Sequence, residues 1–241
     1  AGIGMHRVRV RPAPRVVVVS IGDELVEPGQ SREAGDVFDA NGHALACAVT
    51  DAGGQAFRVA AVPDELRALA DTIEDQLVRA DVLITTGGLS VGQGDTVKDV
   101  LAPLGSVRFD AVAMSPGRQL GVGTVEGTPI FCLPGDPVSA QIAFETFVRP
   151  VLRQIAGRTS LHRSSLPATI SEGWHSPSGK REFVPVRVNG SPSRGYRAEP
   201  TTPPGTVRLH GLSEANAIAV VPEDTSTVVA GDTLHCLLLD A

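Results

Sequence analysis

Acidic side chains follow three short apolar runs in the first half of the chain. Glu24 comes after "VVVVSIGD", Asp64 comes after "RVAAVP", and Asp95 ends "TTGGLSVGQGD", which follows "DVLI". Carboxylate oxygens are the ligands that Mg²⁺ prefers, so these three carboxylates would form a magnesium site if their loops met. The alternative is structural, because Asp64 and Asp95 also stand where helix N-caps belong.

The stretch "TTGGLSVGQGD" is also rich in glycine, so its backbone is not covered by side chains where a buried strand ends. Glycine permits positive φ and lets backbone N–H groups approach an anion closely. Gly87, Gly88 and Gly92 could therefore cradle a phosphate, and Ser90 could add a hydroxyl donor. Neither a P-loop Lys-Ser/Thr pair nor a Rossmann spacing is present, so a tight turn with ordinary capping is the alternative.

Three other segments carry groups that could meet an anion. Arg118 lies in "SPGRQ", where its permanent charge could face a phosphate or oxyanion, although a solvated loop arginine is an equal alternative. In "LPGDPVS", Asp136 precedes Pro137 as a helix cap would, which places Ser139 in the first turn. In "GKREF", Lys180 and Arg181 face opposite sides of a strand, and a solvated sheet edge is the alternative.

Histidine and cysteine usage excludes several kinds of chemistry. The six histidines show no ligand spacing and no arrangement typical of a Ser-His-Asp triad. Cys47, Cys132 and Cys236 are far apart and odd in number, so they form neither a disulfide framework nor a metal knuckle. We interpret all three cysteines as small buried apolar groups.

Composition bounds the chain to one or two soluble domains. It has 241 residues and a net charge of −6, with no basic block, which argues against binding nucleic acid through phosphate contacts. No apolar run approaches the roughly 20 residues that cross a bilayer, and no signal peptide is visible, so we expect a cytoplasmic protein. The opening "AGIGMHRVRVRPAPR" lacks a starting methionine and resembles an interior connector, which suggests a fragment.

The order of elements predicts an α/β fold with a mostly parallel sheet. From Val16 onward, β-branched runs alternate with amphipathic stretches. Asp39 caps a helix in "ANGHALACAVTDAGG", Asp64 begins one in "DELRALADTIEDQLVRA", and a third is in "TVKDVLAPLG". A long helix from Pro137 should kink at Pro150 and end at Gly157.

The character of the sequence changes near residue 160. Short alternating segments such as "EFVPVRV", "AIAVV" and "TLHCLLL" follow, separated by Pro, Gly, Ser and Asp, and predict a small all-β domain. We therefore expect a connector over residues 1–14, an α/β domain over 15–158 and a barrel-like β domain over 163–241.

Taken in order, six loops resemble those of the molybdopterin molybdenumtransferase family, the MoeA and gephyrin E-domain type. They are "GDELVEPG", "FDANG", "VPD", "TTGGLSVGQGDTVKDVL", "PGRQLGVG" and "LPGDPVSAQIAFETFVRPVL", and "GKREF" and "LSEANAIAVVP" match more loosely. The resemblance implies a three-layer molybdopterin-binding domain, a barrel-like C-terminal domain and a homodimer. It also implies a reaction in which adenylylated molybdopterin and molybdate yield molybdenum cofactor and AMP, assisted by Mg²⁺.

The resemblance also implies roles for individual positions. Glu24, Asp64, Asp95 and Arg118 match catalytic positions, with Asp64 and Asp95 as the Mg²⁺ ligands. The positions that the resemblance assigns to ligand binding are Gly22, Asp23, Gly87, Gly88, Ser90, Gly92, Lys98, Pro116, Gly117, Pro134, Gly135, Asp136, Ser139, Lys180 and Arg181. A molybdopterin adenylyltransferase and molybdoenzymes that accept the cofactor are the implied partners.

Several departures from the family pattern keep other functions open. Ser115 and Arg118 replace the lysines of a Lys-Pro-Gly-Lys turn, Asp136 replaces an asparagine, and Thr206 stands where Gly-Ser is usual. The family's N-terminal region, which helps to dimerise and completes the active site, is not found in this sequence. One alternative is therefore a molybdopterin-binding or scaffold module without turnover. Another is a molybdopterin adenylyltransferase, against which the β domain argues.

Overall fold

A computed structural model describes residues 1–89, 96–203, 205–206 and 208–239. The first domain contains a six-stranded sheet in which four neighbouring strands pair in parallel and the last two pairings are antiparallel. The strand order is β4 (Gln55–Arg58), β1 (Arg15–Ser20), β5 (Val82–Thr86), β9 (Thr128–Leu133), β8 (Gln119–Val125) and β6 (Gly105–Ala111), so that only β8 runs against the other five strands. The predicted mostly parallel sheet is confirmed.

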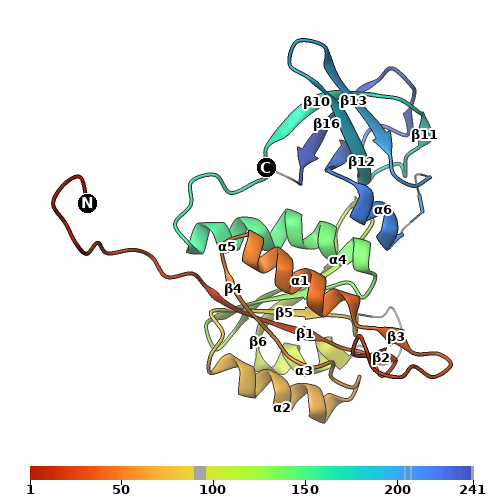
Figure 1. The fold of residues 1–241 in the computed structure, drawn as a ribbon. Helices are drawn as coiled ribbons and strands as arrows, with labels where there is room; N and C mark the ends of the chain where they lie inside the picture. Colours follow the sequence, from red (N-terminus) through yellow and green to blue (C-terminus); the bar gives the residue numbers. More distant parts are fainter. Residues whose placement is uncertain (90–95, 204, 207, 240–241) are drawn as a thin grey trace.

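Helices cover both faces of this sheet and complete the three layers (Figure 1). One face packs under α1 (Ala40–Asp51), α4 (Pro137–Ala143) and α5 (Arg149–Ile155), and the other under α2 (Leu66–Leu77) and α3 (Thr96–Leu104). Successive residues of a strand point to opposite faces. Val16 and Val18 accordingly belong to the first apolar core and Val17 and Val19 to the second.

Two helix starts follow the predicted capping and one does not. Asp39 accepts a hydrogen bond from the Gly42 N–H at 2.8 Å and begins α1, and Asp136 accepts from the Ser139 N–H at 2.8 Å and begins α4. The prediction that Asp64 begins the next helix is wrong, because α2 starts at Leu66. The Asp64 N–H instead donates to the side chain of Asp23.

The long helix after Pro137 is interrupted where the sequence predicted a kink. A π-helical turn, η1 (Phe144–Val148), separates α4 from α5 and ends just before Pro150. Proline lacks the N–H that an α-helix needs at this point, so a wider turn accommodates the chain there. Gly157 follows α5 with a φ of 75°, as expected for a residue that ends a helix.

The second domain is a closed β-barrel. Its strands are β10 (Ser165–Ile170), β16 (Thr233–Leu238), β14 (Ala217–Val221), β12 (Arg181–Ser191) and β13 (Gly195–Pro200), and pairing of β13 with both β10 and β12 closes the barrel. A two-stranded ribbon of β11 (Trp174–His175) and β15 (Thr227–Val228) and the helix α6 (Leu209–Glu214) lie beside it.

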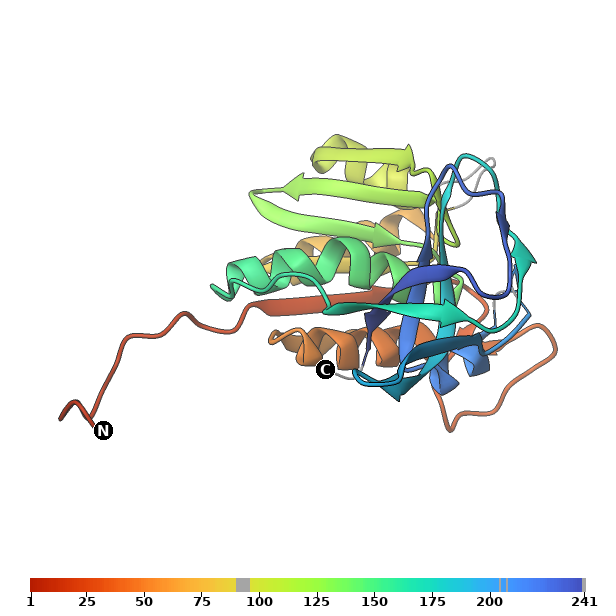
Figure 2. The ribbon, with the colours of Figure 1, turned by 90° about the horizontal axis from the view of Figure 1, so that it is seen from above.

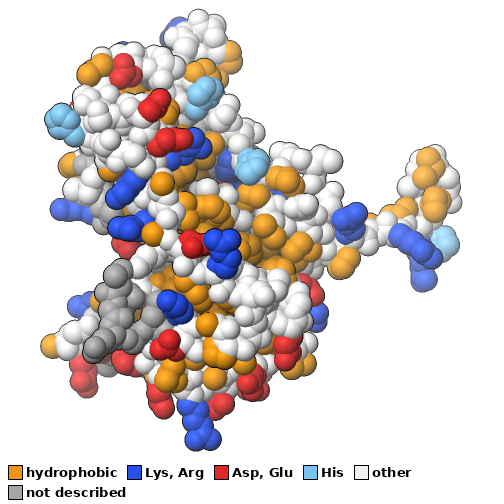
Figure 3. Space-filling model, turned by 180° about the vertical axis from the view of Figure 1, so that it is seen from behind, with side chains coloured by type: hydrophobic (Ala, Val, Ile, Leu, Met, Phe, Trp, Pro, Cys, Tyr) orange, Lys and Arg blue, Asp and Glu red, His pale blue; other side chains and the backbone are white. Residues whose placement is uncertain are grey.

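The two domains are joined by apolar packing and by a partly buried ionic network. The short strand β7 (Met114–Ser115) leaves the α/β domain to pair with β12, and Met114, Ile142 and Phe183 share one apolar cluster. Figure 3 shows hydrophobic side chains gathered where the domains meet on the back of the molecule. In the linker, Arg163 donates to Glu145 at 2.8 and 2.9 Å, to Asp51 at 2.8 Å and to the Leu239 carbonyl at 2.6 Å.

Residues 1–9 extend away from both domains (Figures 1 and 2), and all of residues 1–13 are exposed. None of the helices in the described part of the chain is long and apolar enough to span a membrane. Cys132 and Cys236 are buried as expected, and burial raises the pKa of the Cys236 thiol to about 11. The prediction for Cys47 is wrong, because this thiol is exposed on α1, whose core-facing positions include Leu45 and Val49.

Candidate functional site

A pocket of about 420 Å³ lies beyond the carboxyl ends of the parallel strands. Ligands of open α/β sheets bind at this edge, where strand-end loops lead into helices. The pocket lining comes from the loops after β1, β4, β5 and β9, from the start of α1, and from a short parallel ribbon of β2 (Leu25–Val26) and β3 (Val37–Phe38). Six of the predicted positions line it, namely Gly22, Glu24, Asp64, Gly87, Gly88 and Gly135.

Glycines form a bare backbone surface in this pocket. Gly87 has a φ of 92°, and a Cβ on it would lie 2.2 Å from the Ile21 carbonyl oxygen. Gly88 has a φ of 66°, and a Cβ there would lie 2.5 Å from Cγ2 of Val97. Both positions therefore require glycine on two independent grounds, the sign of φ and the lack of space.

One carboxylate approaches this glycine surface, and a second lies against Gly22 in the same pocket. Asp64 Oδ1 lies 3.7 Å from the position that a Cβ would take on Gly88, and the Asp64 N–H is held by Asp23 Oδ1 at 3.0 Å. The side chain of Glu24 folds back onto Gly22, where Oε2 would be 2.7 Å from a Cβ. Since Asp64 does not cap α2, its carboxylate is available to a ligand or a metal ion.

Asn41 ties two of the strand-end loops together at the back of the pocket. Its Nδ2 donates to Thr86 Oγ1 at 2.8 Å and to the Gly135 carbonyl at 2.9 Å, and Thr86 Oγ1 donates to the Pro134 carbonyl at 2.8 Å. Asn41 is 8% exposed, and its Oδ1 is buried without a hydrogen-bond partner among the described residues. The loops after β5 and β9 are thus fixed relative to the start of α1.

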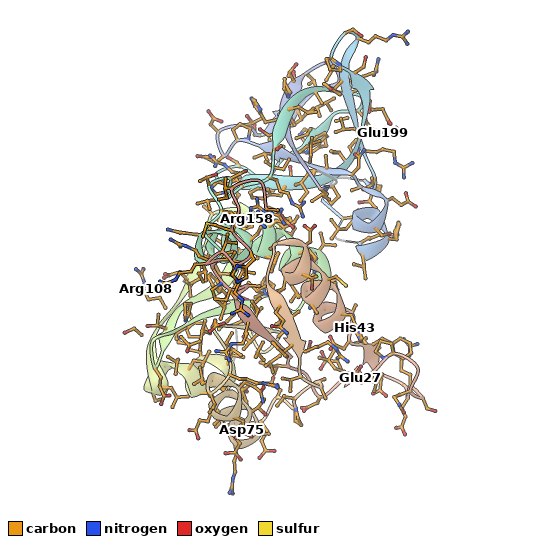
Figure 4. All side chains as sticks on the ribbon, turned by 60° about the vertical axis from the view of Figure 1, so that its left-hand side comes forward. Glu27, His43, Asp75, Arg108, Arg158 and Glu199 are labelled. Carbon is orange, nitrogen blue, oxygen red and sulfur yellow. The ribbon has the colours of Figure 1, made fainter. Side chains whose placement is uncertain are left out.

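A second polar network supports the wall that carries Asp39. The Ser20 hydroxyl donates to Asp39 Oδ1 at 2.8 Å, and Arg58 lies 3.4 Å from Asp39 Oδ2. Arg58 also forms a two-pronged contact with Glu27 at 2.5 and 2.8 Å, and His43 lies 3.5 Å from the same carboxylate (Figure 4). Hydrogen bonds from Arg58 lower the pKa of Glu27 below the usual glutamate range, although burial opposes the shift.

The pocket is acidic. Glu24, Asp39 and Asp64 line it, whereas no Lys, Arg or His is among its described lining residues. Arg58 offsets the charge of Asp39 from behind, which leaves the charges of Glu24 and Asp64 facing the cavity. No group of three or more His, Cys, Asp or Glu side chains lies close enough to bind a metal within the described part of the chain. The described residues thus supply two carboxylates and backbone, and a cation would offset their charge.

The remaining predicted positions near the pocket serve neighbouring loops. Asp23 holds the backbone of Asp64, the Pro134 carbonyl accepts from Thr86, and Asp136 caps α4 through the Ser139 N–H. Pro116 lines a small cavity of about 40 Å³ between the domains, together with Ser115 and Thr206. A Cβ on Gly117, which has a φ of 86°, would lie 3.1 Å from the Ser139 carbonyl oxygen, so this turn packs on the first turn of α4.

The predicted cations do not join the pocket. Arg118 is exposed in its turn, and Lys98 lies on the exposed side of α3. Arg181 forms an ion pair with Glu223 at 2.9 Å, and Lys180 precedes it at the start of β12. Ser90, Gly92 and Asp95 lie outside the described residues.

Residues that the sequence analysis did not select complete the pocket. They include Ser20, Asn41 and Thr86 on the polar side and Leu25, Val37 and Phe38 on the apolar side. Phe38, Asp39 and Asn41 all fall within the segment "FDANG", so this motif could have indicated that they belong to the site. The contacts of Asn41 span 45 and 94 residues of sequence, a distance over which local patterns carry no information.

The fold and this pocket define a three-layer α/β domain with a strand-end ligand pocket, joined to a β-barrel. Residues 17–154 match the family described as a probable molybdopterin binding domain, and residues 167–239 match the MoeA C-terminal region, domain IV. The chain belongs to the family of the probable molybdopterin binding domain, and its second domain matches the MoeA C-terminal region. The resemblance stated from the six loops is confirmed.

Curated relatives agree with this assignment over nearly the whole chain. Molybdopterin molybdenumtransferase 2 of Mycobacterium tuberculosis is 36% identical over 98% of this chain and 59% of its own length. Gephyrin of Dictyostelium discoideum is 26% identical over 99% of this chain and 38% of its own length. The chain therefore spans only part of the curated relatives that it matches.

A solved structure shows the same arrangement of both domains. The molybdopterin biosynthesis MoeA protein from Pyrococcus horikosii superimposes with a TM-score of 0.82 at 28% identity, over 95% of this chain and 55% of that chain. The predicted α/β domain followed by a barrel is confirmed by this superposition.

Proposed function

We propose that the chain is the ligand-binding part of a molybdopterin molybdenumtransferase, which inserts molybdate into adenylylated molybdopterin and releases AMP. The name of the 36% identical relative supports this reaction, and the two-domain match extends the support to the barrel. The observation that carries the proposal is the position of Asp64, whose carboxylate faces the glycine surface at Gly88 inside the strand-end pocket.

The charge of the pocket supports a role for Mg²⁺. A phosphoanhydride brings negative charge to a site already lined by Glu24 and Asp64, so binding requires a cation. Asp64, with Asp95 from outside the described residues, would hold Mg²⁺, and Glu24 lines the same pocket. When bound, Mg²⁺ would neutralise the phosphate that leaves with the adenosine.

The chain's own groups would position the substrate around that charge. Gly87 and Gly88 let the backbone approach the phosphate closely, as no other residue type could at these positions. The Asn41 network holds the loops after β5 and β9 in place, which limits the movement of the bound phosphate. Lys180 and Arg118 are the cations that we propose for molybdate, because Arg181 is already paired with Glu223.

We also propose that the protein acts as a cytoplasmic homodimer. The resemblance assigns part of the active site to a region that the curated relatives possess beyond the length matched here. A molybdopterin adenylyltransferase would supply the adenylylated substrate, and molybdoenzymes would accept the product.

One assay tests the proposed reaction. Purified chain is mixed with adenylylated molybdopterin, molybdate and Mg²⁺, and AMP is measured over time with molybdate omitted as the control. Molybdate-dependent AMP release supports the transferase. Tight binding of adenylylated molybdopterin without AMP release favours the second candidate, a binding module without turnover. Two observations favour this candidate: Asp136 caps a helix, and Arg181 is paired with Glu223.

A further inference from the structure

The pocket has one apolar wall, which the phosphate chemistry does not use. Leu25, Val37 and Phe38 line it from the β2–β3 ribbon, opposite the polar strand ends. Val37 and Phe38 are each 45% exposed, although large apolar side chains on strands are usually covered. Because these side chains border a cavity of about 420 Å³, a bound ligand is the simplest cover for them.

The β2–β3 ribbon is held firmly enough to present this wall. The Val37 N–H donates to the Glu24 carbonyl at 2.8 Å, and the Asp39 N–H donates to the Val26 carbonyl at 2.9 Å. Arg58 contacts Glu27, which directly follows β2, and Asp39, which directly follows β3, so it ties the C-terminal ends of both strands together. A wall fixed in this way costs little ordering free energy when a ligand binds.

An arginine accompanies the aromatic ring. The guanidinium carbon of Arg32 lies 5.7 Å from the centroid of the Phe38 ring, within the range of a cation–π contact. Flat nitrogen heterocycles stack on aromatic rings and on guanidinium planes, and such stacking tolerates differences between bases. A simple phosphate gains nothing comparable from a phenyl ring.

We propose that Phe38, with the Arg32 guanidinium over its ring, is the platform on which the fused heterocycle of the ligand stacks, while its phosphate meets the glycine surface. This inference rests on the proposed function, since it assigns the ring of that substrate to a subsite. Adenine and pterin share the chemistry that this platform recognises, and binding experiments can separate them.

The test measures equilibrium binding of three probes by calorimetry with Mg²⁺ present. The probes are AMP, 6-hydroxymethylpterin and ribose 5-phosphate, which carries a phosphate but no ring. Phe38→Ala should weaken the probe that stacks by about tenfold and leave ribose 5-phosphate unchanged. Phe38→Trp should retain binding, and Phe38→Leu, which keeps the apolar bulk, should behave like the alanine variant.

The affected probe identifies the ring, adenine or pterin. Equal loss for AMP and ribose 5-phosphate, wild-type affinity in Phe38→Leu, or no preference of the wild type for either ring compound would each overturn the proposal. Phe38 is half exposed, so all three variants should fold, and circular dichroism verifies this. These outcomes are independent of AMP release from adenylylated molybdopterin, so failure of this inference and failure of the proposed reaction are distinguishable.

Discussion

The backbone N–H of Asp64 donates to the carboxylate of Asp23 across 3.0 Å, which joins the loop after β4 to the loop after β1. This contact explains why Asp64 does not cap a helix, since its backbone is held before α2 begins at Leu66. The Asp64 carboxylate is left facing Gly88 in the pocket. The Asp64 side chain thereby lines the pocket instead of capping α2.

The glycine surface should be intolerant of a single methyl group. Gly87→Ala combines a φ of 92° with a clash at 2.2 Å, and we expect a loss of about 3 kcal/mol in the free energy of unfolding. Gly53→Ala is the matched control, because Gly53 has a φ of 93° but no atom within 4 Å, and it should lose only about 1 kcal/mol. If urea unfolding shows equal losses of stability for Gly87→Ala and Gly53→Ala, the close approach of Gly87 to Ile21 does not contribute to the cost of the substitution.

The hydrogen bond between Asn41 and Thr86 should appear as an energetic coupling. Each of Asn41→Ala and Thr86→Val should destabilise the chain by about 1–3 kcal/mol, since their partners are buried. The double variant should lose less than the sum by at least about 0.5 kcal/mol. Thr50→Val on the exposed side of α1 should show no coupling with Asn41→Ala, and additive losses for Asn41 and Thr86 would contradict the network.

Acid should weaken the contact between Glu27 and Arg58. The pKa of Glu27 is lower in the folded chain, so its contribution is present above the usual glutamate pKa and disappears as pH falls through the folded value. The stability difference between wild type and Glu27→Gln should therefore be largest near neutral pH and shrink toward pH about 3. Urea unfolding across this range measures it, with Glu74→Gln on exposed α2 as the control. A difference that is constant with pH would refute the assignment.

The ionic network at the domain junction should couple the two domains. Arg163→Ala leaves the buried Glu145 without its main partner, and we expect a loss of about 3 kcal/mol and two separate transitions in calorimetry. Arg158→Ala, an exposed arginine of the same linker, should change stability by no more than about 0.5 kcal/mol. A single transition at the wild-type temperature in Arg163→Ala would show that the network does not join the domains.

Local patterns were sufficient to predict most elements of this fold. Alternating and apolar runs predicted β5 and β14, and the Asp136–Pro137 pair predicted the start of α4. The ribbon of β2 and β3 was missed, because two-residue strands leave no periodic pattern. The prediction for α2 was wrong by two residues, since the sequence does not show that Asp23 holds the Asp64 backbone.

The candidate site was predictable only in part. Glycines and carboxylates at strand ends are informative because the topology brings parallel strand ends to one edge, and this indicated Gly87, Gly88 and Asp64. The places of Asn41 and Phe38 in the site could not be predicted, because the residues that surround them are distant in sequence. Whether Arg181 is free or paired was equally hidden, because Glu223 is 42 residues away.

We propose that Asp64 places a metal ion and a phosphorylated ligand on the glycine surface, and the decisive experiment is calorimetric binding of adenylylated molybdopterin with and without Mg²⁺. We predict that Mg²⁺ tightens binding by at least about tenfold in the wild type and in Asp75→Asn, an exposed control on α2, but not in Asp64→Asn. An Asp64→Asn variant that folds and binds with the same dependence on Mg²⁺ as the wild type would contradict the claim.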